Sequence, residues 1–359
     1  MATEFLANAK SNKNDEFYTQ WVDIESEVQA YLEYNPDVFR GKTILCPCDD
    51  PDWSNFTKYF ALHFSDYGIK KLISTSYAVE SKGNKEVFQY SLFEMNDPKY
   101  DETKTLVKGK IFVLEENNSE KVNIDHLQWD YMDGDGDFRS DEVKKLRDEA
   151  DIIITNPPFS LFREFVAWIV GADKQFLIIS NVNAITYKEI FPLIRDNKMW
   201  MGLAFGRGFK GFIIPDSYPL SGAESRIDEH GNRIVSTNNT IWFTNLDHGR
   251  RHRPLPLMTM ADNLKFSKHK NIRGKTSYDK YDNFNAIEVP FTDAIPSDYN
   301  GVMGVPISFL NKYCPEQFEI IGCSYDYGRP EGWDKSINMS VTVNGVNTYK
   351  RLLIKHKEV

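Results

Sequence analysis

Residues 151–159 of this 359-residue chain read Asp-Ile-Ile-Ile-Thr-Asn-Pro-Pro-Phe and indicate where a strand ends and a site begins. The β-branched run from Ile152 to Thr155 predicts a strand that is buried on both faces, as in a parallel sheet. Pro157 and Pro158 lack a backbone N–H and hold φ at about −65°, so the chain leaves the sheet as a rigid loop. Ligands bind at the carboxyl ends of strands in open α/β sheets, and this loop is therefore a candidate site.

The loop offers a carboxamide, two carbonyls and an aromatic ring, a set suited to methylation of a planar amino group. The lone pair of such a nitrogen is delocalised into its ring. The Asn156 side-chain oxygen and the Pro157 carbonyl can each accept one N–H bond and so free the lone pair, while Phe159 stacks on the flat base. A sulfonium methyl donor is already activated, so positioning supplies most of the acceleration. The alternative is a structural turn, which needs neither a carboxamide nor an aromatic residue at these places.

The rest of the chain alternates between short apolar runs and helical spacing, which predicts an α/β fold. We expect strands at 43–46, 71–77, 176–179 and 241–243, and helices at 24–34, 54–64, 162–170 and 187–194, the last ended or kinked by Pro192. The order strand, loop, helix, strand is typical of a parallel sheet with right-handed crossovers. A hairpin around Gly109 with a strand at 111–114 is expected to interrupt this order. Residues 202–238, rich in Gly, Pro and Ser, are expected to be loops.

The composition is that of an ordinary soluble globular protein, with 41% hydrophobic and 26% charged residues. The length allows one α/β domain with a smaller addition. No apolar stretch approaches the roughly 20 residues of a membrane helix, and the first residues form no hydrophobic signal region. A cytoplasmic protein without a membrane partner is therefore expected.

The net charge of −9 argues against a nucleic-acid partner only if the charges are spread evenly. Between residues 248 and 280 there are nine Lys or Arg residues and two Asp residues, a local charge of +7. Phe266, Ile272 and Tyr278 are interleaved with these charges, which indicates an ordered binding segment. A solvated charged surface is the alternative.

Neither the cysteines nor the acidic run around residue 135 predicts a metal site. The cysteines at 46, 48, 314 and 323 have Cys-x-Cys and Cys-x8-Cys spacings, which differ from those of zinc ribbons and fit reduced structural thiols. The Asp-Gly-Asp-Gly-Asp run at 133–137 matches the first ligands of an EF-hand loop. Its next required Gly and its bidentate Glu are replaced by Phe138 and Lys144, so calcium is excluded as well.

Three motifs together resemble those of a known enzyme family. Residues 156–159 resemble the catalytic motif of amino-group DNA methyltransferases that use S-adenosylmethionine. Residues 14–20, Asn-Asp-Glu-Phe-Tyr-Thr-Gln, are similar to the N-terminal cofactor motif of the EcoRI-type adenine-specific methylases. Residues 46–51, Cys-Pro-Cys-Asp-Asp-Pro, followed by Ser-Asn-Phe at 54–56, resemble the first cofactor loop of that group. The order of the motifs also matches, and they span residues 14–160.

The resemblance implies a doubly wound, mostly parallel α/β sheet of the S-adenosylmethionine-dependent methyltransferase type. Residues 1–246 would form the catalytic domain and 247–359 a smaller target-recognition and DNA-binding region. The implied catalytic residues are Asn156, Pro157, Pro158 and Phe159. The implied cofactor-binding residues are Phe17, Tyr18, Thr19, Cys46, Asp49, Asp50, Asp137 and Phe138.

Roles for several of these residues follow from the resemblance. A carboxylate after the first strand would accept a hydrogen bond from the methionyl ammonium of the cofactor. Asp137 would accept one from the amino group of the cofactor's adenine, and Phe138 would lie against the adenine ring. The structural alternatives are a helix cap at 49–51, a polar turn at 136–138 and core packing for Phe17 and Tyr18. The chain has no glycine between positions 42 and 67, where many methyltransferases have Gly-x-Gly, and it shares this departure with the EcoRI-type group.

The predicted function is transfer of a methyl group from S-adenosylmethionine to adenine N6 in double-stranded DNA, with the target base flipped into the pocket beside Phe159. A cognate restriction endonuclease is a candidate partner. The alternatives are the same chemistry on RNA adenine, on cytosine N4 or on a glutamine amide, and a catalytically silent DNA-binding or anti-restriction protein. An intact catalytic motif argues against the silent protein. The expected DNA-binding residues are Arg250, Arg251, Arg253, Lys268, Lys270, Arg273 and Lys275.

Overall fold

The computed structural model describes residues 18–78, 99–116, 123–124, 127–205, 209–214, 225–228, 231–235, 239–337 and 340–357. The chain divides into two compact units, one formed by residues 1–184 and 201–248 and the other by 185–200 and 249–359. Within the described ranges, no helix is both long and apolar enough to cross a membrane. The predicted contacts of Phe17 and of the Tyr18 side chain lie outside the described residues.

An eight-stranded sheet forms the centre of the first unit. In spatial order its strands are β5 (Asp130–Tyr131), β4 (Lys110–Glu115), β3 (Lys71–Thr75), β2 (Thr43–Cys46), β6 (Ile152–Thr155), β7 (Gln175–Asn181), β12 (Thr240–Thr244) and β8 (Trp200–Phe205). The central strands β3, β2, β6 and β7 are parallel, whereas β4, β5 and β12 pair antiparallel with their neighbours. The sheet is therefore mixed, and the predicted parallel character holds for its centre.

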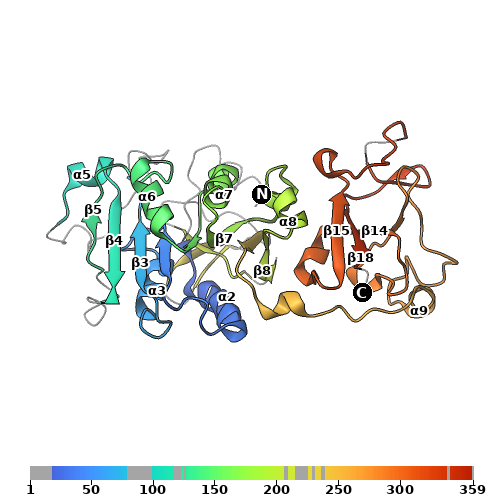
Figure 1. The fold of residues 1–359 in the computed structure, drawn as a ribbon, viewed down its shortest axis with the longest axis horizontal. Helices are drawn as coiled ribbons and strands as arrows, with labels where there is room; N and C mark the ends of the chain where they lie inside the picture. The colour runs from blue at the N-terminus through green and yellow to red at the C-terminus, as the bar shows by residue number, and fades with distance from the viewer. Residues whose placement is uncertain are drawn as a thin grey trace. The chain divides into compact units, whose positions relative to one another are not determined.

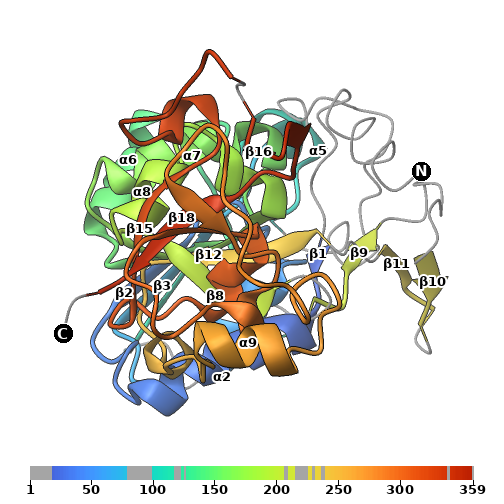
Figure 2. The same ribbon diagram turned by 90° about the vertical axis from the view of Figure 1, so that its right-hand side faces the viewer.

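Helices cover both faces of this sheet. Figures 1 and 2 show α2 on one face and α6 and α7 on the other, and α3 packs against α2. Ile24, Val28 and Tyr31 of α2 are fully buried, as the helical spacing predicts. The bounds of the helices are α2 (Trp21–Tyr34), α3 (Asn55–Leu62), α5 (Glu102–Val107), α6 (Asp141–Glu149) and α7 (Phe162–Val170).

A second, antiparallel sheet belongs to the same unit, and Figure 2 shows its strands side by side. In spatial order they are β1 (Tyr18–Thr19), β9 (Phe212–Ile214), β11 (Arg233–Val235) and β10 (Ser225–Ile227). The expectation that residues 202–238 form only loops is therefore wrong, because β8 to β11 lie there. These strands are three to six residues long and set among Gly and Pro, too short to produce a clear alternation of apolar and polar residues.

Two local expectations also need correction. Gly109 does not turn a hairpin, because α5 precedes it and β4, which follows it, pairs with β3 and β5. Pro192 neither ends nor kinks a helix; it lies in the first turn of α8 (Phe191–Arg195), where its missing N–H is not needed.

The second unit contains a smaller sheet and a separate two-stranded ribbon. The sheet order is β13 (Ala286–Glu288), β14 (Val302–Val305), β18 (Leu352–His356) and β15 (Phe318–Cys323). The ribbon pairs β16 (Thr342–Val343) with β17 (Val346–Asn347), and α9 (Met260–Phe266) lies earlier in the chain. Tyr281, Trp333, Val341 and Leu353 belong to one buried cluster of this unit.

Candidate active site

A cavity opens at the carboxyl edge of the parallel strands in the first unit. It encloses about 850 Å³ of empty space, counting its opening to solvent. The segments that follow β2, β3 and β6 all contribute to its wall, as expected where parallel strands end together. The lining residues are Thr19, Pro47, Cys48, Asp49, Asp50, Ser54, Asn55, Phe56, Ser76, Tyr77, Gly136, Asp137, Phe138, Asn156, Pro158 and Leu161.

Asp49 joins the loop after β2 to the end of β6. Its carboxylate is buried and accepts hydrogen bonds from Ser54 Oγ at 2.6 Å and from Thr155 Oγ1 at 2.5 Å. Ser54 Oγ in turn accepts from the backbone N–H of Phe56 and caps α3. Thr155 directly precedes Asn156, so one carboxylate sets the spacing between the two loops. The cap of α3 is therefore Ser54 and not a residue of 49–51, and Asp49 holds the side chain of that cap.

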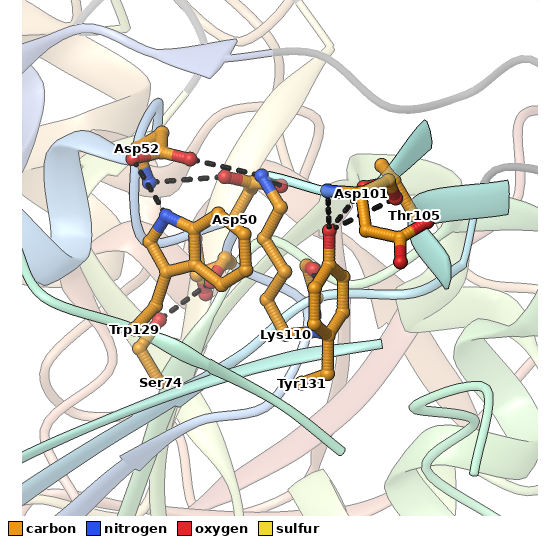
Figure 3. A network of polar contacts seen from close by, with 10 residues as sticks. Asp50, Asp52, Ser74, Asp101, Thr105, Lys110, Trp129 and Tyr131 are labelled. Atoms are coloured by element: carbon orange, nitrogen blue, oxygen red, sulfur yellow. Dashed lines mark hydrogen bonds and ion pairs between the residues drawn. The ribbon is translucent and has the colours of Figure 1, made fainter. Parts of the chain in front are cut away.

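Asp50 lines the cavity and lies beside a buried lysine (Figure 3). The Lys110 side chain, only 4% exposed, places its ammonium 2.9 Å from Asp52 and 3.7 Å from Asp50. The ammonium also lies over the ring of Trp129 at 4.4 Å, and the Trp129 indole N–H donates to Asp52 at 3.1 Å. These three described side chains, two carboxylates and one ammonium, together carry one formal negative charge next to the cavity.

The backbone and the charges around Asp52 fix this arrangement. The Asp52 backbone N–H donates to Asp50 Oδ1 at 2.9 Å, so the two carboxylates are held on one turn. Burial and the neighbouring Asp50 raise the pKa of Asp52, while the Lys110 ammonium and the Trp129 N–H oppose that rise. Lys110 begins β4, and its carbonyl accepts from Ser76 N at the end of β3. The antiparallel strand β4 thus delivers the cation to the edge where the parallel strands end.

Asp137 faces the cavity with its carboxylate held by Arg139. Arg139 donates from its backbone N–H at 2.8 Å and from its guanidinium at 2.5 Å, and the Tyr77 hydroxyl donates at 3.2 Å. Burial alone would raise the pKa of Asp137, but the bonds and charge of Arg139, together with Tyr77, lower it below its ordinary value. Gly136 has a φ of +80°, and a Cβ there would lie 2.0 Å from the Ser76 carbonyl oxygen, so only glycine fits.

The loop after β6 places its residues at different depths. Asn156 and Pro158 line the cavity, whereas Pro157 is buried and does not line it. Phe159 begins the 3₁₀ helix η4 (Phe159–Leu161). Its ring packs in a T-shaped arrangement with that of Phe212 on β9, with the ring centroids 6.2 Å apart. The second sheet therefore supports the aromatic residue of the loop.

The N-terminal segment closes another side of the cavity. The Thr19 carbonyl in β1 accepts from Asn55 Nδ2 at 2.8 Å, which ties β1 to the start of α3. The Thr19 side chain is buried, and its Oγ1 has no hydrogen-bond partner among the residues that the structure describes. A buried hydroxyl without a partner on a cavity wall is suited to bond a ligand.

The predicted site residues divide into those on the cavity wall and those away from it. Thr19, Asp49, Asp50, Asp137, Phe138, Asn156 and Pro158 line the cavity. Pro157, Phe159 and Cys46 do not line it. Cys46 is fully buried within β2, and this burial raises the pKa of its thiol well above its usual range. Phe138 also packs against the rings of Phe165 and Trp168.

Ser76, Tyr77 and Lys110 are the main residues that sequence reasoning missed. The predicted strand at 71–77 includes Ser76 and Tyr77 at its end, whereas β3 ends at Thr75. With the strand end placed correctly, the rule that put Asn156 at the edge would also have found them. The sequence around Lys110 does not predict its place beside the cavity, because that place depends on β4 running antiparallel to β3.

The predicted basic segment lies in the second unit and is not uniform. Arg251 is 7% exposed, its guanidinium lies over the Trp200 ring at 3.7 Å, and it donates to Asn197. Lys268 pairs with Asp293 and Lys275 pairs with Asp279, both at the surface. Of the four remaining predicted cations, Arg250 is partly buried in η6 (Gly249–His252). Arg253, Lys270 and Arg273 are exposed and form no ion pair with any described residue.

Comparisons with known proteins cover nearly the whole chain. The family model of the adenine-specific methyltransferase EcoRI matches residues 5–357. The Type II methyltransferase M.EcoRI of Escherichia coli is 47% identical over 356 residues, covering 99% of this chain and 97% of that protein. M.MgeORF184P of Mycoplasma genitalium is 32% identical and M.MpnI of Mycoplasma pneumoniae 31%, each over 98% of its own length and at least 98% of this chain. No solved structure matches. The chain therefore belongs to the EcoRI family of adenine-specific methyltransferases.

Proposed function

We propose that this methyltransferase transfers the methyl group of S-adenosylmethionine to N6 of adenine at a specific site in double-stranded DNA. The observation that carries the proposal is that Asn156 of the catalytic loop and Asp50 of the first cofactor loop line one cavity. The family is adenine-specific, and its relatives are Type II methyltransferases. A restriction endonuclease that cuts the same site is the partner that this class of enzyme suggests.

The cavity suits the proposed methyl donor. Phe56, Phe138 and Leu161 provide apolar surface for a flat adenine ring, and the Thr19 hydroxyl offers a buried polar group without a partner among the described residues. We assign the methionyl end to the side of Asp50, where the net negative charge of the Lys110 cluster would attract an ammonium and a sulfonium. When bound, S-adenosylmethionine supplies a methyl group activated by its sulfonium, and transfer leaves a neutral thioether.

Asn156 and Pro157 are proposed to prepare the amino group of the base. The Asn156 side-chain oxygen and the Pro157 carbonyl would each accept one of its N–H bonds, which draws the nitrogen toward tetrahedral geometry and frees its lone pair. The nitrogen then forms its bond to the methyl carbon and releases one proton to water. No strong general base is required, because the leaving group is already good and the geometry supplies most of the rate.

The target adenine would have to leave the duplex to reach this loop. We propose that it flips out and lies against Phe159, whose ring is held by Phe212. Extrusion costs a few kcal/mol in lost base stacking. Stacking of the base on Phe159, worth about 1–3 kcal/mol, would offset part of that cost.

Among the predicted DNA-binding cations, we propose phosphate contacts for Arg253, Lys270 and Arg273, which are exposed. Lys268 and Lys275 would exchange a surface carboxylate for a phosphate at little cost, since such pairs contribute at most about 1 kcal/mol. Arg251 is better suited to supporting this segment, because its guanidinium is buried on Trp200.

The test is direct methylation of DNA by the purified chain. Duplex DNA is incubated with S-adenosylmethionine labelled in its methyl group, digested to nucleosides and analysed by mass spectrometry, with a second sample sequenced by a methylation-sensitive method. We expect labelled N6-methyladenine at one short sequence. Label only in N4-methylcytosine, or only in an RNA substrate, would contradict the proposal.

A further inference from the structure

The ribbon of β16 and β17 in the second unit is short but firmly held. Its two-residue turn, Asn344-Gly345, has φ angles of 51° and 76°, as in a type I′ hairpin turn. The Asp282 carboxylate accepts from the backbone N–H groups of both turn residues, at 3.2 Å and 2.7 Å. The Asp282 backbone N–H donates to the Thr342 carbonyl at 2.9 Å. One aspartate therefore fixes the tip of the ribbon and its first strand.

The underside of the ribbon is anchored in the core of this unit. Val341 is fully buried with Trp333 and Leu353, and Val343 packs against the same cluster. Within the ribbon, Thr342 Oγ1 donates to Asn347 Oδ1 at 3.2 Å. The ribbon is thus an ordered element with a fixed outer face.

Two large side chains are exposed on and just after the ribbon. Val346 is 68% exposed and Tyr349, two residues after β17, is 81% exposed. A single exposed apolar residue needs no explanation, but two large exposed side chains that line the same groove indicate a contact surface.

The groove beside the ribbon is neutral and rich in hydrogen-bonding groups. It encloses about 1040 Å³ of empty space, counting its opening, between residues 271–279 and 343–349. Its charged lining residues cancel, because Lys275 pairs with Asp279 at 2.5 Å and Arg351 pairs with Glu288 at 2.5 Å. The uncharged polar groups on its wall come from Asn271, Ser277, Asn347 and Thr348.

The positions next to this wall are cationic. Lys270, Arg273 and Lys350 are exposed, and each adjoins a lining residue in sequence. None of them forms an ion pair with another described residue. Cations at the edge and neutral hydrogen-bonding groups inside match the two parts of duplex DNA, whose phosphates fix position and whose base edges carry sequence.

We propose that the β16–β17 ribbon enters the major groove of the substrate DNA and reads part of the target sequence. The major groove admits a two-stranded ribbon, and its base edges suit these side chains, because an apolar residue such as Val346 can contact a thymine methyl group and an amide such as Asn347 can bond adenine. Lys270, Arg273 and Lys350 hold the flanking phosphates. This inference rests on the proposed function and names the surface that gives it specificity.

The experiment compares Val346→Asp and Tyr349→Ala with wild type and with Val107→Asp. Val107 is 52% exposed at the end of α5 in the first unit, so it controls for adding a carboxylate at an exposed valine. Each protein methylates a library of random-sequence duplexes that is then sequenced for N6-methyladenine. Affinity for a duplex with the wild-type motif, and for one without it, is measured by fluorescence anisotropy, and S-adenosylmethionine affinity by calorimetry.

We expect both ribbon variants to bind the motif duplex about 10- to 100-fold more weakly, to show a relaxed or altered motif, and to bind S-adenosylmethionine as wild type does. Unchanged motif and affinity in both ribbon variants would overturn the inference and leave the proposed function intact. An equal loss in Val107→Asp would also overturn it, since the effect would then be one of general charge. A wild-type library without methylated adenine would instead refute the proposed function.

Discussion

In the first unit, the Lys110 ammonium is buried between Asp50 and Asp52, whereas in the second unit Lys275 meets Asp279 at the surface with 41% of its side chain exposed. The first cavity is built from buried hydrogen-bonded carboxylates at strand ends. The second is a neutral groove beside an exposed ribbon and unpaired cations.

The difference follows from what each region must hold. Methyl transfer depends on positions within a fraction of an ångström, and buried charges with several bonds each provide such fixed geometry. Contacts to DNA phosphates need charge within reach, and exposed side chains provide it at little cost in folding. Substitutions in the two regions should therefore fail in different ways.

The largest effect is expected for Asn156→Ala, which removes the proposed amino-group acceptor from the first cavity. Methyl transfer should fall by about 1,000-fold, the order of loss when one positioned polar group is removed from an active site. Single-turnover rates with labelled methyl donor measure it, and calorimetry should show nearly unchanged S-adenosylmethionine affinity. A variant that turns over at close to the wild-type rate would end the catalytic assignment.

Next comes Lys110→Met, which leaves Asp50 and Asp52 together without their cation. Removing one partner from a buried ion pair should lower the free energy of unfolding by about 3 kcal/mol, as measured by urea denaturation. The matched control is Lys71→Met, whose pairs with Glu115 and Glu149 lie nearer the surface and should cost at most about 1 kcal/mol. An equal loss of unfolding free energy in both variants would show that the burial of Lys110 does not increase its contribution to stability.

A third test uses pH on Asp23, a buried carboxylate of the first unit. Burial raises its pKa to about 7, although the backbone N–H of Lys210 donates to it. Between about pH 4 and pH 7, Asp23 is protonated in the folded chain and ionised in the unfolded chain. The raised pKa therefore stabilises the folded chain fully below about pH 4, and this contribution is lost as the pH rises to about 7. The free energy of unfolding of Asp23→Asn should therefore rise by about 2 kcal/mol relative to that of wild type between pH 5 and pH 7. A constant difference over that range would contradict the raised pKa.

The smallest effect is expected at the exposed cations of the second unit. Replacing Arg253, Lys270 or Arg273 singly by Ala should shallow the slope of log affinity against log salt by about 0.9, because one phosphate contact is lost. Arg251→Ala should leave that slope unchanged and instead reduce stability, since its guanidinium lies buried over Trp200. The reverse pattern would show that Arg251 reaches DNA and that the exposed cations do not.

Much of the first unit could be predicted from local sequence. The strand at 152–155, its end before the two prolines and the helices at 24–34 and 162–170 depend on residue type and spacing within single segments. The carboxyl ends of parallel strands lie together, so the predicted strands also placed Asn156 and Asp50 on one edge.

The sequence by itself therefore determined the central parallel strands, the loop that follows β6 and the family to which the motifs point. The tertiary structure alone decided that β4 and β12 run antiparallel, that Lys110 lies between two carboxylates nearly 60 residues away, and that Arg251 is buried while its neighbour Arg253 is exposed. Strand ends and turns depend on neighbouring residues. Strand direction, burial and ion pairing between distant residues depend on how the whole chain packs, and no single segment carries that information.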